Sequence, residues 1–228
     1  MKIHGAAELV QDVNVAKQML VEVNQRYLKG ETLDRSTYAE DRKVLSTGQK
    51  PFAVIVTCSD SRVAPEIYFD QKLGDIFIIR NAGNVCDATA LGSIEYAVEH
   101  LGTRLVVICG HSSCGAVTAA VQGGELPPNI KSITDQIQPA VAKGGDVDQV
   151  IRQNVAAMVA ITQADEILNP DGATVVGAYY DISPGELSWL PTLVCAAATL
   201  SFRILNPLSI NRREPPLQRL RSPPPPPA

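Results

Sequence analysis

Four short runs of branched aliphatic residues recur along the chain, and they constrain its fold more than any other feature. They read FAVIVT, DIFIIR, RLVVIC and ATVVGAYY, at residues 52–57, 75–80, 104–109 and 173–180. Polar residues do not alternate with apolar ones in these runs, as they would in a strand with one face in water. Each run is therefore predicted to be a strand buried on both faces, which is typical of a parallel sheet covered by helices.

Stretches with helical spacing separate these runs. Apolar residues recur every three or four positions from Ala6 to about Leu28, and Gly30 offers a stop, so a long N-terminal helix is predicted. Residues 90–102 and 146–168 have the same spacing and precede the third and fourth runs. Strands that alternate with helices predict an α/β fold, with a central, mostly parallel β-sheet flanked by helices.

The character of the chain changes near its end. A turn-like SPG at residues 183–185 leads into ELSWL, a candidate for a short antiparallel edge strand. We predict one domain over residues 1–190. The remaining residues, 191–228, form an atypical tail with a short apolar stretch and then many prolines and arginines, so disorder is expected from about Asn211.

Composition favours an enzyme that acts on a small molecule over a protein that binds nucleic acid or a membrane surface. The 228 residues carry a formal charge of −4 and the pI is near 5.4, which gives no attraction to nucleic acid or anionic lipid. The longest apolar stretch, from Leu187, is shorter than the roughly 20 residues of a spanning helix, and Pro191 interrupts it. The N-terminus lacks the apolar core of a secretory signal, so we expect a cytoplasmic protein.

The five cysteines form an odd set without the spacing of a small disulfide-bonded domain. This favours reduced thiols or a metal site over disulfide bonds. Cys109 lies inside an aliphatic run and is predicted to be a core residue. No chemistry is assigned to the other cysteines and histidines that stand outside the two motifs described next, namely Cys86, Cys195, His4 and His100.

Two of the predicted strands end abruptly in potential metal ligands. The first strand is followed by CSDSR, which begins at Cys58. The third is followed by GHSSCG, which contains His111 and Cys114. The carboxyl ends of neighbouring parallel strands share one crevice, so these three residues can meet there. Two thiolates and one imidazole favour Zn²⁺, and three protein ligands leave the open position of a catalytic site. The alternative is that both cysteines are small core residues and the histidine a loop residue.

Asp60 and Arg62 follow Cys58 in the same loop. A carboxylate beside zinc could become the fourth ligand, or it could accept a hydrogen bond from a zinc-bound water. The guanidinium of Arg62 could hold that carboxylate away from the metal by pairing with it bidentately. The alternative for these two residues is a local surface salt bridge.

Four motifs, in this order and spacing, together resemble a β-class carbonic anhydrase. They are CSDSR at residues 58–62, RNAGN at 80–84, EYAV at 95–98 and GHSSCG at 110–115. The resemblance runs from the N-terminal helix to about Leu190. It implies a lyase that hydrates carbon dioxide reversibly to bicarbonate and a proton by a zinc-bound hydroxide.

The resemblance also implies the roles of the site residues. One Zn²⁺ per subunit would be bound by Cys58, His111 and Cys114. In an open form Arg62 would hold Asp60 while water binds zinc, and in a closed form Asp60 would itself be the fourth ligand. A homodimer or homotetramer is implied, with N-terminal helices laid over the neighbouring subunit.

One departure from the family concerns regulation. Some members close under bicarbonate through a pocket that contains a tryptophan three residues before the first zinc-binding cysteine. That position is Ile55 here, and the only tryptophan of the chain is Trp189. We therefore expect the open type without bicarbonate regulation, although Arg80 and Tyr96 match other parts of that pocket. Thiolate ligands further predict activity at neutral to alkaline pH.

Two other functions share these motifs. A few relatives of the family hydrolyse CS₂ or COS on the same scaffold, and a non-catalytic zinc-binding interaction protein could retain the fold. The presence of both Asp60 and Arg62 argues against the second. A phosphatase loop needs more residues between its cysteine and arginine than CSDSR provides, and no G-x-G-x-x-G follows a predicted strand.

Overall fold

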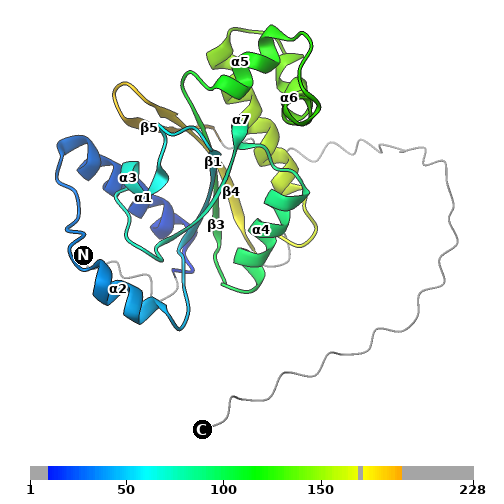
Figure 1. Cartoon of the computed structure of the whole chain (residues 1–228). Helices are drawn as coiled ribbons and strands as arrows, with labels where there is room; N and C mark the ends of the chain where they lie inside the picture. Colours follow the sequence, from blue (N-terminus) through cyan, green and yellow to red (C-terminus); the bar gives the residue numbers. More distant parts are fainter. Residues whose placement is uncertain (1–9, 169–171, 192–228) are drawn as a thin grey trace, which may run out of the picture. The chain divides into compact units, whose positions relative to one another are not determined.

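A five-stranded sheet forms the centre of the protein. The computed structural model describes residues 10–168 and 172–191, and in this part of the chain the strand order is β2-β1-β3-β4-β5 (Figure 1). The strands span Ala53–Cys58 (β1), Ile76–Asn81 (β2), Leu105–His111 (β3), Thr174–Asp181 (β4) and Glu186–Trp189 (β5). The first four pair in parallel and β5 is antiparallel to β4, so the predicted sheet and its antiparallel edge strand are confirmed.

The two central strands carry the core. Every residue of β1 and of β3 is buried, as their unbroken aliphatic sequence predicts for strands covered on both faces. At the edge of the sheet, β2 is only half-buried along most of its length. The two strands that end in the predicted ligands are thus neighbours in the middle of the sheet.

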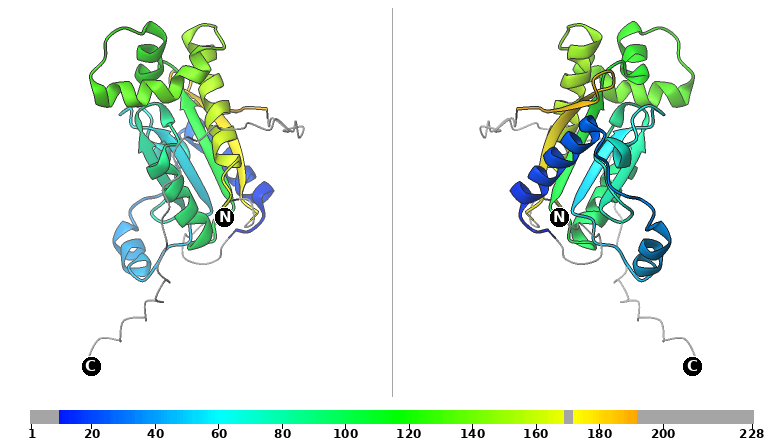
Figure 2. Two further views of the ribbon diagram at one scale, coloured as in Figure 1. Left: turned by 90° about the vertical axis from the view of Figure 1, so that its right-hand side faces the viewer. Right: turned by 90° about the vertical axis from the view of Figure 1, so that its left-hand side faces the viewer.

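Helices cover both faces of the sheet. In Figures 1 and 2, α1 lies on one face, and α4 and α7 lie on the other. The helices span Val13–Lys29 (α1), Tyr38–Leu45 (α2), Pro65–Tyr68 (α3), Ala88–Glu99 (α4), Gly115–Gln122 (α5), Pro128–Val141 (α6) and Val147–Gln163 (α7), and a 3₁₀ turn, η1, spans Ala82–Asn84. The helical spacing therefore located α4 and α7 correctly, and the fold class is confirmed.

The N-terminal helix begins later than its apolar spacing predicts. Residues 10–12 are not helical, and α1 starts at Val13 because the side chain of Asp12 accepts hydrogen bonds from the N–H groups of Asn14 and Val15. The predicted start near Ala6 lies outside the described residues. The helix ends where predicted, before Gly30, which has the left-handed φ of 70° typical of a helix stop.

Four helices, α2, α3, α5 and α6, were not expected from the sequence. They are short or contain proline: α6 begins at Pro128 and includes Pro139. Within residues 10–168 and 172–191, no helix has both the length and the apolar character needed to cross a membrane. The predicted tail, 191–228, lies outside the described residues except for Pro191.

Candidate metal centre

The carboxyl ends of β1 and β3 bring three potential ligands together. Cys58 is the last residue of β1, His111 is the last residue of β3, and Cys114 is the N-cap of α5. Their ligand atoms all lie within 4.8 Å of one another, and all three side chains are buried. The structure thus assembles the three residues that the two motifs single out.

The hydrogen bonds of His111 leave one ring nitrogen free to bind a metal. Its Nδ1 lies 2.9 Å from the backbone oxygen of Ser112. Because a carbonyl oxygen only accepts hydrogen bonds, Nδ1 carries the proton in the neutral imidazole, and the lone pair is then on Nε2. Nε2 is buried and has no hydrogen-bond partner among the described residues, an arrangement that costs about 1–3 kcal/mol unless a ligand satisfies it.

Ser112 is itself held in place by the far end of β4. Its Oγ donates to Oδ1 of Asp181 at 3.1 Å and accepts a hydrogen bond from the N–H of Ile182 at 2.9 Å. The carbonyl that fixes the tautomer of His111 is therefore anchored to the β4–β5 turn. Sequence analysis missed this role for Ser112, because nothing in the motif shows where its hydroxyl is bonded.

The two thiols shift each other's pKa in opposite directions. A hydrogen bond from Cys114 lowers the pKa of Cys58 to about 4, against the opposing effect of burial. The same bond, together with burial, raises the pKa of Cys114. A cation among these groups would deprotonate both thiols. Two sulfurs and one unpaired imidazole nitrogen, all buried, fit the donor set that Zn²⁺ prefers.

Asp60 and Arg62 form a two-pronged ion pair next to this cluster. Nε of Arg62 donates to Oδ1 of Asp60 at 3.0 Å, and Nη2 donates to Oδ2 at 2.7 Å. Nη2 also donates to the backbone oxygen of Ser113 at 3.2 Å, which joins the CSDSR loop to the GHSSCG loop. The hydrogen bonds from Arg62 hold the pKa of Asp60 well below its usual range, so the carboxylate is ionised.

Arg80 holds the backbone of the CSDSR loop from the other side. Its Nε donates to the carbonyl of Cys58 at 3.0 Å and its Nη2 to the carbonyl of Asp60 at 2.7 Å. The fork of one guanidinium thereby fixes the two loop residues that carry the chemistry. From the sequence, Arg80 was singled out only as a match to a regulatory pocket.

Gly83 contacts the metal centre through its backbone. Its N–H donates to Sγ of Cys58 at 3.4 Å, and its φ of +75° lies in the region that favours glycine. A β-carbon at this position would lie 2.9 Å from Cδ1 of Ile137 and 3.2 Å from Cβ of Ala116. Both the backbone angle and the space around it therefore require glycine.

Substitution of Gly83 by alanine tests this contact. We expect Gly83→Ala to lose about 1–2 kcal/mol of stability from the left-handed backbone alone and to retain less zinc after dialysis, because the N–H is displaced from Cys58. The matched control is Gly30→Ala, which has a φ of +70° with no atom within 4 Å of the added β-carbon. Thermal unfolding and zinc content would be measured for both variants. Equal zinc retention in the two would contradict the proposed contact.

The other cysteines and histidines stay apart from this cluster. Cys86 and Cys109 are buried, and burial raises the pKa of Cys86 to about 11 and that of Cys109 to about 12, as for inert core thiols. The ring of His100 is tilted against that of Tyr96 on α4, with ring centroids 5.1 Å apart. The remaining two, Cys195 and His4, lie outside the described residues.

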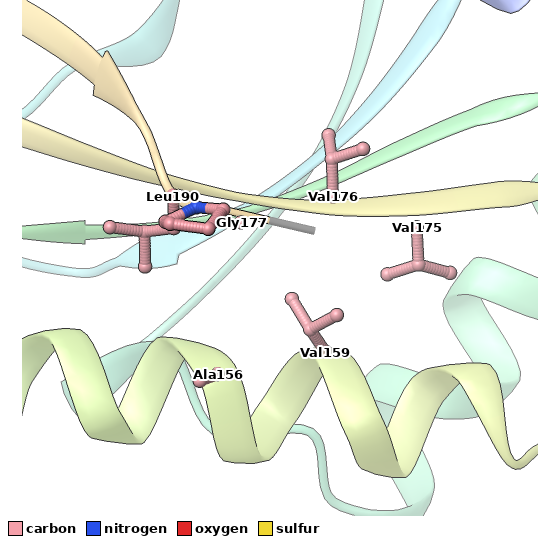
Figure 3. A pocket seen from close by; sticks show the side chains of 7 residues that line it. Ala156, Val159, Val175, Val176, Gly177 and Leu190 are labelled. Carbon is pink, nitrogen blue, oxygen red and sulfur yellow. The ribbon is translucent and has the colours of Figure 1, made fainter. Parts of the chain in front are cut away.

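A hollow elsewhere in the fold carries no such chemistry. It lies between α7 and β4, where Val159 and Val175 line it, and it is partly open to solvent (Figure 3). Leu190 also lines it, and none of the side chains in the lining has a polar group. The candidate centre is therefore the cluster at the ends of β1 and β3.

Comparisons with known proteins agree with this site. A family model described as carbonic anhydrase matches residues 53–187. Carbonic anhydrase 2 of Mycobacterium tuberculosis is 40% identical over 185 residues, which cover 75% of this chain and 89% of that protein. The carbonic anhydrase of Pseudomonas aeruginosa is 32% identical over 169 residues, which cover 65% and 77%.

The fold is also similar to solved structures. The β-carbonic anhydrase of Coccomyxa, determined in complex with acetazolamide, matches with a TM-score of 0.62 and 26% identity, over 75% of this chain and 84% of that one. The chain belongs to the carbonic anhydrase family, and to its β class. The resemblance noted in the sequence and the predicted class of enzyme are both confirmed.

Proposed function

We propose that the protein hydrates carbon dioxide reversibly to bicarbonate and a proton, with one Zn²⁺ per subunit on Cys58, His111 and Cys114. The observation that carries this proposal is the buried cluster of three ligand atoms, one of which is an unpaired imidazole nitrogen. When bound, Zn²⁺ lowers the pKa of a coordinated water from about 15.7 toward roughly 7 and so supplies a hydroxide nucleophile near neutral pH.

In this proposal Asp60 orients the nucleophile and Arg62 positions Asp60. The ligand atoms of Cys58, His111 and Cys114 are close enough to share a metal, and Asp60 does not belong to this group. The bidentate pair with Arg62 engages both carboxylate oxygens of Asp60 and leaves lone pairs that can accept a further hydrogen bond. These contacts support the open form. The closed form, with Asp60 as fourth ligand, would require the pair to break.

We further propose that the site lacks the bicarbonate regulation of some family members. Ile55, at the position of their tryptophan, is fully buried in β1. The fork of Arg80 already donates to two carbonyls of its own chain. Added bicarbonate should therefore act on the rate only as the product of the reaction.

A stopped-flow assay of carbon dioxide hydration, with zinc quantified in the same sample, tests the proposed activity. We expect about one zinc per chain and a rate that disappears when a chelator removes the metal. A zinc-loaded chain without hydration would contradict the proposal. The same sample would then be assayed with COS and CS₂, since activity on either would indicate the sulfur-substrate enzyme and none would indicate a non-catalytic protein.

The ion pair at Asp60 makes a prediction about pH. A carboxyl whose pKa is lowered in the folded state contributes stability above its ordinary pKa and loses it only as the pH falls through the lowered value. Asp60 is therefore ionised across pH 6–9, and the rise in rate that we expect over this range comes from formation of the nucleophile. Asp60→Asn should lower the rate at every pH in this range. A profile that is flat or falls would contradict this.

We also propose that the protein is a homodimer or homotetramer and is cytoplasmic. Within the described part of the chain, α2 has no buried residue, and the apolar residues of the edge strand β2 are only half-buried. By contrast, α1 packs against α3, β3 and β5 of its own chain, so α2 has the freer face for a neighbouring subunit. Sedimentation analysis would measure the assembly, and cell fractionation the location.

A further inference from the structure

One polar residue interrupts the buried apolar face of α7. Asn154 is 1% exposed and lies between core residues of the same helix, Ile151, Val155 and Met158. An amide in such a place must find hydrogen-bond partners or lose stability. The helix packs on β3 and β4 and also contacts α5.

The amide of Asn154 is bonded to the residue that contacts Cys58. Its side-chain nitrogen, Nδ2, donates to the carbonyl of Gly83 at 2.9 Å, and a carbonyl can only accept, so the orientation of the amide is fixed. The N–H of Gly83 in turn donates to Sγ of Cys58 at 3.4 Å. Two consecutive hydrogen bonds therefore run from α7 to a sulfur of the metal centre.

This arrangement is not explained by stability alone. Oδ1 of Asn154 is buried and has no hydrogen-bond partner among the described residues, so half of the amide's capacity is unused. A leucine of similar size would remove that unsatisfied acceptor and leave only the Gly83 carbonyl without its partner. The bond that the amide does make fixes a glycine whose φ of +75° is set by the turn, and whose N–H must face one particular sulfur.

We propose that Asn154 is a positioning residue for the metal centre. By holding the carbonyl of Gly83, it aims the N–H of Gly83 at Cys58 and so fixes the position of that sulfur. Hydrogen bonds to metal ligands orient them and tune their strength as donors, and their loss typically costs 10- to 100-fold in metal affinity. The inference rests on the proposed zinc site.

Cobalt and zinc binding by the full chain test this role apart from activity. Wild type, Asn154→Leu and Asn154→Thr would be loaded with Co²⁺ to record the thiolate-to-cobalt absorption band, and titrated with Zn²⁺ against a chromogenic chelator. The threonine variant retains a hydroxyl that bonds within its own helix, and it serves if the leucine variant does not fold. In both variants we expect the absorption band to shift and the zinc affinity to fall by up to about tenfold.

The matched control is a second buried asparagine on the opposite face of the sheet. Asn24 on α1 donates to the carbonyls of Tyr68 and Gly185 and has no contact with the metal centre. Asn24→Leu should lower the melting temperature of the metal-free chain while leaving the cobalt spectrum and zinc affinity unchanged. If the variants of Asn154 behave like this control, the inference is overturned and the proposed function stands. A wild-type chain that binds neither metal overturns both.

Discussion

Replacing Cys114 with serine is expected to remove zinc from the protein and to lower the rate of carbon dioxide hydration by more than about a hundredfold. Loss of a residue that only hydrogen-bonds to a ligand typically lowers metal affinity or activity 10- to 100-fold. Here a neutral hydroxyl replaces the ligand itself, so the effect should be larger. Cys114 is fully buried at the N-cap of α5, a position that serine suits well. The fold should therefore persist. Zinc per chain and stopped-flow rate would be measured on one sample.

The control for this prediction replaces another buried thiol, that of Cys109 in β3. Cys109 lies in β3, two residues before His111, and its Sγ contacts the hydroxyl of Tyr68 at 3.6 Å. Cys109→Ser should retain zinc and a rate within a few fold of wild type, at some cost in stability. A Cys114→Ser variant with full zinc and wild-type rate would show that the cluster is not the metal site.

Replacing Asp60 with asparagine is expected to lower the rate by roughly 10²- to 10⁴-fold without loss of zinc. The amide has the same shape but places a donor opposite a guanidinium that only donates, so the pair with Arg62 no longer forms as it does now. Zinc should remain because Asp60 is outside the ligand cluster. Arg62→Ala should have a similar effect, because it frees the carboxylate to approach the metal. Steady-state rates and zinc content of both variants check this.

A surface ion pair provides the matched control. Lys131 and Asp135 on α6 pair at 2.6 Å, one turn apart and with both side chains more than half exposed. Such a pair contributes about 0.5 kcal/mol or less. Lys131→Ala should leave the rate unchanged. Asp60 and Arg62 would have no part in catalysis if their variants were as active as this one.

The sequence predicted the sheet better than it predicted the helices. An aliphatic run such as that of β1 has few alternatives to a strand buried on both faces, so four strands and the antiparallel edge were located correctly. The start of α1 was placed too early because the apolar spacing continues upstream, whereas the side chain of Asp12 caps the helix. The prolines of α6 concealed a helix, since Pro128 occupies the first turn, where no N–H is needed.

For the site, the sequence named the reactive groups but not the contacts that position them. Cys58, His111 and Cys114 were recognisable because soft ligands stood at the ends of two aliphatic runs. Nothing local indicated that the carbonyl of Ser112 selects the tautomer of His111, since Ser112 is held through its hydroxyl by Asp181 from another strand. The only local signal for a positioning contact was Asn154, a polar residue on the apolar face of α7.

Residue type and spacing alone determined the class of fold, the ligands Cys58, His111 and Cys114 as candidates, and the pairing of Asp60 with Arg62, because those features depend on near neighbours in the chain. Tertiary structure decided the rest. Only the parallel pairing of β1 with β3 places the ligand atoms within 4.8 Å of one another, and only the packing of α7 brings Asn154 to Gly83. Hydrogen bonds between residues distant in sequence depend on where the sheet and helices put them, which no local pattern encodes.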